Sequence, residues 1–198
     1  MWPFSNKKKE AKPSVSVAQA LDQLSALGIR PRPGITHDDL LQSLEGTMDS
    51  PVDWISLLCT LGGEVKRGGF HRISDDIWHI DAECIVETGD YVQVLERFII
   101  LTKNLLPLTD LRDHVDIDNG EAWVEFTLDG KTVHWDLEVH DDWLDPNLYT
   151  KMQDLATARC GGKKFFITAL GQDSLISFGT PAMKDTLSNL TRLKFEWE

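Results

Sequence analysis

Apolar residues recur every three or four positions in three short blocks between residues 15 and 63. The first two blocks open at Ser16 and Thr36, each followed three residues later by a side chain that can complete a capping box. The third opens with Ser50-Pro51, where proline at the first helical position loses no hydrogen bond. The pattern therefore predicts a layer of three short helices over residues 15–63.

After residue 63 the apolar side chains recur at two spacings, every second residue in some segments and about every 3.6 residues in others. Residues 77–84 alternate apolar and polar side chains, which predicts a half-buried strand. From Asp90, the expected cap, to Lys103 the apolar residues cover more than one helical face, which predicts a helix buried on most sides. Later segments predict a helix over 146–160 capped by Asp145, a hairpin over 164–178, a helix opening at Thr180-Pro181 and a strand over 193–197.

Two dipeptides between these elements favour tight two-residue turns, Asn119-Gly120 and Asp129-Gly130. They predict an antiparallel meander of strands near 111–118, 121–128 and 131–140. Two-residue turns also fix the register. Val115 should then face Val124, and Val124 should face Trp135.

The fold class expected from these elements is α+β, with short N-terminal helices followed by a mainly antiparallel sheet that helices pack on one face. We expect one domain over 15–198, made of a helical layer (15–63) and a part with sheet and helices (64–198). Residues 1–14 are predicted to be a disordered tail, because the apolar tip precedes the lysines and the order does not fit a secretion signal. An alternative is that Trp2 and Phe4 touch a membrane surface.

Composition narrows the classes of function. The chain has 32 acidic against 20 basic residues and a net charge of −12, which argues against nucleic-acid binding. No stretch approaches the roughly 18 apolar residues that cross a membrane. Three widely spaced cysteines without a C-x-x-C motif indicate reduced thiols and a cytoplasmic protein. Nucleotide-binding and hydrolase-elbow motifs are absent from the sequence, and we expect no cofactor.

The predicted register places the polar residues of the meander together on one face. One expected row contains His114, Glu125 and His134, the next Asp116, Trp123 and Asp136, and the third Asp118, Glu121 and Glu138. The outer strand is expected to continue through His140 to Asp141, Asp142 and Trp143.

Three interpretations of this face stay open. It can be the solvated side of an antiparallel sheet. It can be a binding surface for a basic protein, formed by Asp116, Trp123, Glu125, Asp136, Glu138, Asp141, Asp142 and Trp143. In the third interpretation, His114, Glu125 and His134 bind a divalent metal, and the protein is a metal-dependent hydrolase.

Three segments carry a resemblance to other proteins: ISDDIWHIDAE (73–83), LTDLRDHVD (108–116) and VHWDLEVHDDW (133–143). They resemble an uncharacterised family of small acidic bacterial proteins over most of residues 15–197, and this resemblance implies no activity. In size, acidity and mixed layout the chain is also similar to immunity proteins that neutralise bacterial toxins. We therefore expect a non-enzymatic protein that binds a basic protein partner. The sequence does not indicate its oligomeric state.

Overall fold

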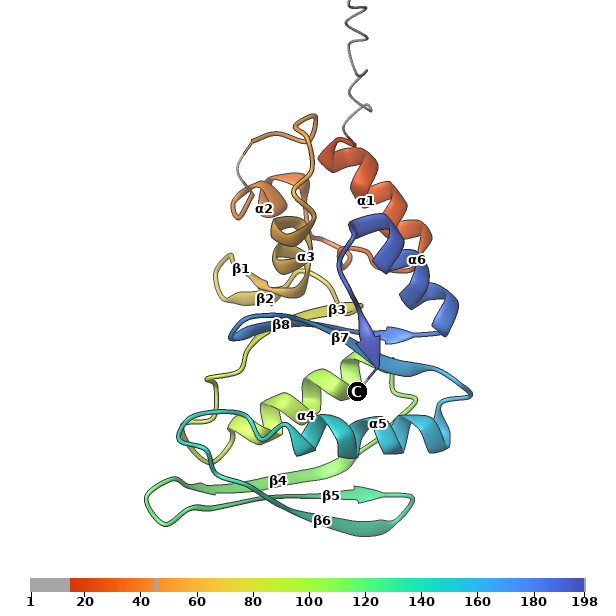
Figure 1. Cartoon of the computed structure of the whole chain (residues 1–198). Coiled ribbons are helices and arrows are strands. Elements are labelled where there is room, and N and C mark those ends of the chain that lie inside the picture. The colour runs from red at the N-terminus through yellow and green to blue at the C-terminus, as the bar shows by residue number, and fades with distance from the viewer. Residues whose placement is uncertain (1–14, 45, 198) are drawn as a thin grey trace, which may run out of the picture.

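The computed structural model describes residues 15–44 and 46–197, so the predicted tail 1–14 lies outside the described residues. Helices and strands lie in stacked layers (Figure 1). In chain order the elements are α1 (Val17–Ala26), α2 (His37–Leu41), α3 (Trp54–Gly62), β1 (Glu64–Lys66), β2 (Phe70–Arg72), β3 (Ile77–Asp81), α4 (Asp90–Leu101), β4 (Thr109–Asp116), β5 (Glu121–Leu128), β6 (Lys131–Leu137), α5 (Asn147–Arg159), β7 (Lys164–Leu170), β8 (Asp173–Gly179), α6 (Pro181–Thr191) and β9 (Glu196–Trp197).

The described strands form antiparallel sheets, which confirms the α+β class, but they do not join into one sheet. A central four-stranded sheet has the order β3-β8-β7-β9, the meander is a separate sheet β4-β5-β6, and β1 pairs only with β2. In Figure 1, α1, α2, α3 and α6 cover one side of the central sheet. α4 and α5 lie between its other side and the meander (Figure 1).

The central sheet is buried on both faces, and two hydrophobic cores share it. On β3, Ile77 belongs to the core beneath the N-terminal helices, whereas Trp78 belongs to the core around α4. Phe165 and Phe166 on β7 divide in the same way. Successive side chains of a strand point to opposite faces, so each strand supplies both cores. The prediction of a half-buried strand over 77–84 is therefore wrong in burial and in length.

The first three helix starts follow the predicted capping chemistry with one correction. Ser16 and Thr36 each form a complete capping box. The third helix does not start at Pro51. It begins at Trp54 because the carboxylate of Asp53 accepts a hydrogen bond from the Ile55 N–H at 3.1 Å. Pro51 instead lies in a bridge with Ser16.

The register of the meander is as predicted at one turn and shifted by two residues at the other. Asp129 (φ 53°) and Gly130 (φ 73°) both take the left-handed conformation that a two-residue turn needs, and Val124 faces Trp135. In the first turn only Gly120 does so (φ 69°), and the loop widens to residues 117–120. Val115 consequently faces Ala122, not Val124.

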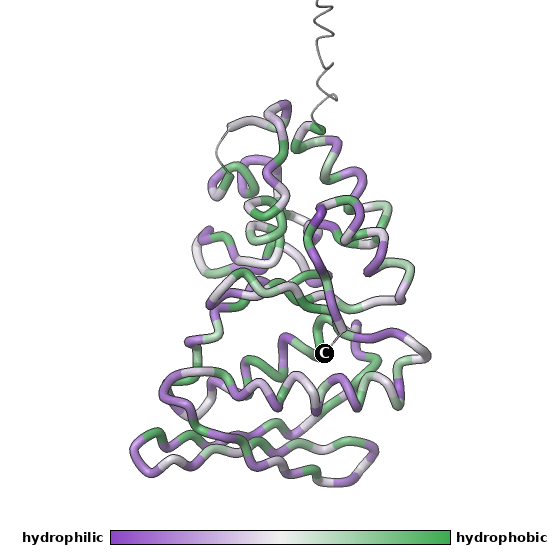
Figure 2. The backbone as a smooth tube through the Cα atoms, viewed as in Figure 1, coloured by the Kyte–Doolittle hydropathy of each residue, from purple (hydrophilic) through white to green (hydrophobic). Residues whose placement is uncertain are grey.

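A shift of two residues leaves every side chain of β4 on its predicted face. Along β5 every second position is buried and the positions between are exposed or half-buried, and Figure 2 shows hydrophobic and hydrophilic residues alternating along the meander. Ala122, Val124, Phe126 and Leu128 point into the core around α4. The opposite face of the meander is left to solvent.

One buried carboxylate on the inner face of the meander caps α4. Asp113 on β4 is 8% exposed and accepts hydrogen bonds from the N–H groups of Gly89, Tyr91 and Val92 at 2.8–3.3 Å. The expected cap, Asp90, is instead the first residue of the helix and accepts from the N–H groups of Val86 and Glu87. Strand β4 is thus tied directly to the positive end of the α4 dipole.

Asp145 makes the matching connection at the other side of the meander. It is 1% exposed, and its carboxylate accepts from the Asn147 N–H at the start of α5 and from the Glu138 N–H just after β6. Its own N–H donates to the hydroxyl oxygen of Tyr91 on α4 at 3.2 Å. The cap position of α5 is Pro146, one residue later than predicted, although the Asp145 carboxylate still accepts from the first helical N–H and also fixes the end of β6.

The substitution Asp113→Ala tests how much the cap of α4 stabilises the fold. We expect it to lower the free energy of unfolding by about 2–3 kcal/mol, because three N–H groups at the start of α4 lose a charged acceptor in a buried place. Urea denaturation followed by circular dichroism measures this change. Asp118→Ala, at an exposed position of the neighbouring turn, is the control and should change stability by less than about 0.5 kcal/mol. Equal stability of the two variants would contradict the capping role.

Candidate functional site

The solvent-facing side of the meander, which we call the outer face, carries most of the residues predicted to bind a partner. It is formed by the outward side chains Arg112, His114, Asp116, Glu121, Trp123, Glu125, Thr127, Thr132, His134 and Asp136, with Glu138 directly after β6. Five of these are carboxylates and one is an arginine. The outer face is therefore strongly acidic.

The cross-strand rows differ from the prediction because of the wider first turn. Arg112, not His114, lies opposite Glu125, which in turn faces His134. His114 lies one row further along, opposite Trp123 and in line with Asp136. The predicted row of His114, Glu125 and His134 is therefore wrong.

Trp123 lies between the two imidazoles of the outer face. Its ring centroid is 5.9 Å from that of His114, nearly parallel at 27°, and 5.2 Å from that of His134 at 36°. The indole is half-buried. Aromatic groups held in this way form a flat, stiff platform that loses little conformational entropy when a partner packs on it.

Most of the carboxylates around this platform remain available to a partner. Glu125 is 3.6 Å from the Arg112 guanidinium, and the imidazole of His134 is 3.3 Å from Asp136. Exposed pairs of this kind stabilise a fold very little. The Asp136 side chain is 92% exposed and that of Glu138 67%, so both can pair with a cation.

Asp116 is the exception, because the turn uses its carboxylate. It accepts hydrogen bonds from the Asn119 side-chain amide at 2.8 Å and from the Asn119 N–H at 3.0 Å. These bonds stabilise the charged form and lower the pKa of Asp116. Asp116 also pairs directly with Glu121 across the strands, an arrangement of like charges that weakens a sheet.

Three of the predicted binding residues lie outside the outer face. Strand β6 ends at Leu137, and the chain then turns away to pair with the segment after β3. The Asp142 carbonyl accepts from the Ile85 N–H, and Trp143 forms a bridge with Glu83. Trp143 is 40% exposed, but it, Asp141 and Asp142 belong to this loop rather than to a continued outer strand. The predicted strand to residue 140 is wrong because Asp145 fixes Glu138.

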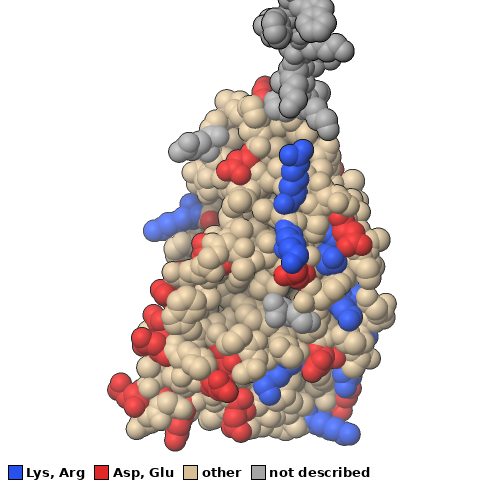
Figure 3. All heavy atoms as spheres, viewed as in Figure 1, with Lys and Arg blue, Asp and Glu red and all other residues tan. Residues whose placement is uncertain are grey.

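A hollow adjoins the outer face beside the N-terminus of α5. It has a volume of about 380 Å³ and is lined by Asp136, Glu138, Asp145, Asn147, Thr150 and Lys151. Figure 3 shows acidic side chains gathered at the lower left, over the end of the meander where β4 turns into β5. A projecting basic side chain of a partner would find both space and negative charge in this hollow.

The geometry bears on the metal interpretation too. The Trp123 ring lies between His114 and His134, which excludes their joint contact with one ion in this arrangement. Within residues 15–44 and 46–197, no group of three or more His, Cys, Asp or Glu side chains could hold a metal ion.

Sequence reasoning missed a concave site between β3 and α4. A cavity of about 370 Å³ lies there, with Trp78 on β3 and Arg97 on α4 among its lining residues. On β3, His79 and Asp81 also line this cavity. A charged residue within the mostly apolar α4 segment, Arg97, was the available signal.

Comparison with known proteins identifies no relative. No protein-family model matches the chain, and neither the curated proteins nor the solved structures include a significant match. The resemblance of the three segments to a bacterial family therefore stays a prediction. In the described part of the chain, no helix has the length and apolar character needed to cross a membrane.

Addition of zinc tests the metal interpretation. We expect a molar excess of Zn²⁺ to leave the melting temperature unchanged within about 1 °C, because a ligand stabilises a fold only if it binds the native state. Differential scanning calorimetry of the wild type and of His134→Ala measures this. A rise that occurs in the wild type and disappears in His134→Ala would contradict the separation of the two imidazoles.

Asn119→Ala tests the turn at Asp116. In the wild type, the hydrogen bonds to the charged carboxylate stabilise the fold above the pKa of the unfolded chain, and this contribution is lost as the pH falls through the lowered pKa of the folded chain. We expect the variant to raise the pKa of Asp116 toward its ordinary range, as measured by carbon-detected NMR titration. Asn189→Ala on α6 is the control, and an unchanged pKa in Asn119→Ala would refute this cause.

Proposed function

We propose that the protein is a non-enzymatic binding protein whose acidic outer face engages a basic protein. The observation that carries this proposal is the Trp123 platform, flanked by two imidazoles and lying opposite the almost fully exposed Asp136. Tryptophan is enriched among the residues that dominate the energy of protein interfaces, and polar residues typically form the rim around them.

The distribution of charge supports a cationic partner. Asp116 and Glu121 oppose each other at one end of the outer face, and Glu138 follows at the end of β6. A face used only for solvation would gain stability from pairs of opposite charge instead. A basic partner would relieve the repulsion and gain attraction at the same time.

The shape of the outer face favours a protein over a small molecule. The strands present an open sheet surface, and the hollow lined by Asp136, Glu138 and Lys151 lies at its edge. A small cation would leave most of its surface exposed to solvent there. A folded partner, in contrast, could cover the Trp123 platform and place a Lys or Arg side chain in the hollow. A basic toxin domain neutralised by this surface fits the proposal best.

The double variant Asp136→Lys/Glu138→Lys tests the proposal. We expect it to lose at least one basic protein that the wild type captures from lysate of the native host. The association rate of that purified partner should fall by about tenfold or more at low salt, and the difference should shrink at high salt. Surface plasmon resonance at two salt concentrations measures this rate.

Asp22→Lys/Asp49→Lys is the matched control, because both carboxylates are exposed on the N-terminal layer and the change in net charge is identical. It should retain the partner. Identical sets of captured proteins for the wild type and both double variants would refute the proposal, as would an equal loss of association rate in both.

A further inference from the structure

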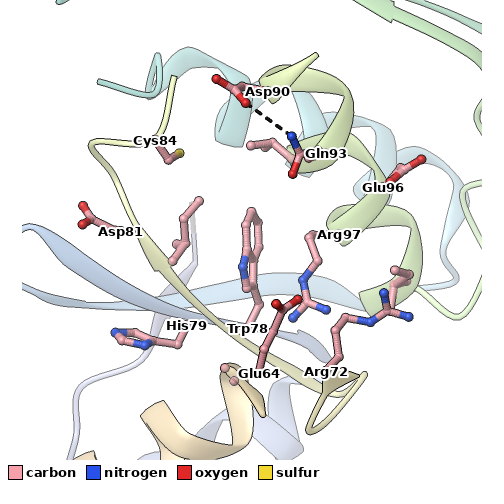
Figure 4. A pocket seen from close by; sticks show the side chains of 15 residues that line it. Glu64, Arg72, Trp78, His79, Asp81, Cys84, Asp90, Gln93, Glu96 and Arg97 are labelled. Carbon is pink, nitrogen blue, oxygen red and sulfur yellow. Dashed lines mark hydrogen bonds between the residues drawn. The ribbon is translucent and has the colours of Figure 1, made fainter. Parts of the chain in front are cut away.

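The cavity between β3 and α4 is a site distinct from the outer face. Its floor is β3, with Trp78 rising toward the helix, and its roof is α4, from which Arg97 reaches down toward Trp78 (Figure 4). Glu64 at the start of β1 and Arg72 at the end of β2 border it. Its volume of about 370 Å³ lies within the range of small-molecule sites.

Arg97 is partly buried, and its guanidinium has no hydrogen-bond acceptor among the described residues. Its Nη1 atom is buried without a hydrogen-bond acceptor, and none of the described residues forms an ion pair with it. Its guanidinium lies over the indole of Trp78, whose ring centre is 5.6 Å from Cζ. Among the described residues the only other buried side-chain nitrogen without a hydrogen bond is Nε2 of His79, but it lies 3.5 Å from the Asp173 carboxylate, and His79 points away from Arg97 (Figure 4).

Leaving such a group unpaired costs folding free energy. Burial, and in second place the neighbouring Arg72, lower the pKa of Arg97 to about 10, so the group stays protonated at neutral pH. A partly buried cation that keeps its charge, with one nitrogen fully buried and no acceptor among the described residues, indicates an acceptor supplied from outside.

The other charged groups of the cavity limit the charge of that acceptor. Asp81 and Asp90 are already held by hydrogen bonds from the backbone and from Gln172 and Gln93. Glu64 points toward the guanidinium in Figure 4, although these two described residues form no ion pair within 4.0 Å. The lining holds four carboxylates (Glu64, Asp81, Asp90 and Glu96) against the two guanidiniums of Arg72 and Arg97, and this net negative charge disfavours a doubly charged phosphate more than a singly charged carboxylate.

The remaining wall of the cavity is apolar. Trp78, Ile80, Val94, Ile100 and the half-buried Cys84 line it. Burial raises the pKa of the Cys84 thiol to about 11, so this side chain is neutral and adds to the apolar wall. An occupant would gain by burying a hydrocarbon or aromatic part against these side chains.

We propose that this cavity binds a small organic carboxylate, whose carboxyl group pairs with the Arg97 guanidinium and whose apolar part packs on Trp78. The planar fork of a guanidinium matches a carboxylate in two parallel hydrogen bonds. Glu64 occupies the approach to Arg97 and opposes the ligand by its charge.

Titration with benzoate, phenylacetate and hexanoate tests the proposal in the full-length protein, with ¹⁵N NMR detection of the Trp78 indole and the amides of α4. We expect saturable shifts of these resonances by at least one of the acids up to about 10 mM. Benzamide, the neutral counterpart, should bind at least about tenfold more weakly. Phenyl phosphate separates the two anion chemistries and should also bind more weakly than the carboxylates.

Substitutions assign the interaction. Arg97→Gln should weaken binding at least about tenfold, Arg97→Lys less, and Glu64→Gln should tighten it severalfold. Arg112→Gln, at an exposed position of the outer face, is the matched control and should bind as the wild type does. Absence of shifts with all three acids, equal binding of benzamide, tighter binding of phenyl phosphate, unchanged binding in Arg97→Gln or weaker binding in Glu64→Gln would each overturn the proposal.

Discussion

The position of the meander depends on the buried carboxylate of Asp113. Helix α4 begins after Gly89, which has no side chain that could cap the helix. Asp113 on β4 supplies the cap at the N-terminus of α4, and this contact joins the helix to the meander. Because α4 also packs on the central sheet through Phe98, whose ring lies 5.7 Å from Trp78, the cap aligns three layers at once.

The sequence was most informative where a local signal acts alone. The capping boxes at Ser16 and Thr36, the turn at Asp129-Gly130 and the alternation on the meander involve only neighbouring residues, and the structure confirms them. At Asn119-Gly120 two local signals compete. The dipeptide favours a two-residue turn, but the Asp116 carboxylate captures the Asn119 amide and widens the loop.

Long-range contacts explain what sequence reasoning missed. A carboxylate in an otherwise apolar row, such as Asp113, looks like an interruption of the pattern until the helix that it caps is known. The same holds for Arg97 and Glu64, which come from α4 and β1 and meet at the cavity only after the central sheet has formed. The sequence could predict an acidic outer face that contains Trp123, because a register shift of two residues keeps every side chain on the same side of the sheet. It could not predict which residues lie opposite one another across the strands.

The pairing of β3 with β8 has a consequence for the order of folding. Ile77 faces Ser177, so this ladder closes a chain segment that contains α4, the whole meander, α5 and β7. The hairpins of the meander and of β7 with β8 join close neighbours and can form early, whereas contacts between distant residues form slowly because loop closure costs entropy. We therefore expect β3 to dock late on a preformed β7–β8 hairpin. Strand β3, the floor of the Arg97 cavity, is then among the last parts of the molecule to fold. A ligand that contacts both α4 and β3 would therefore slow unfolding more than it speeds folding.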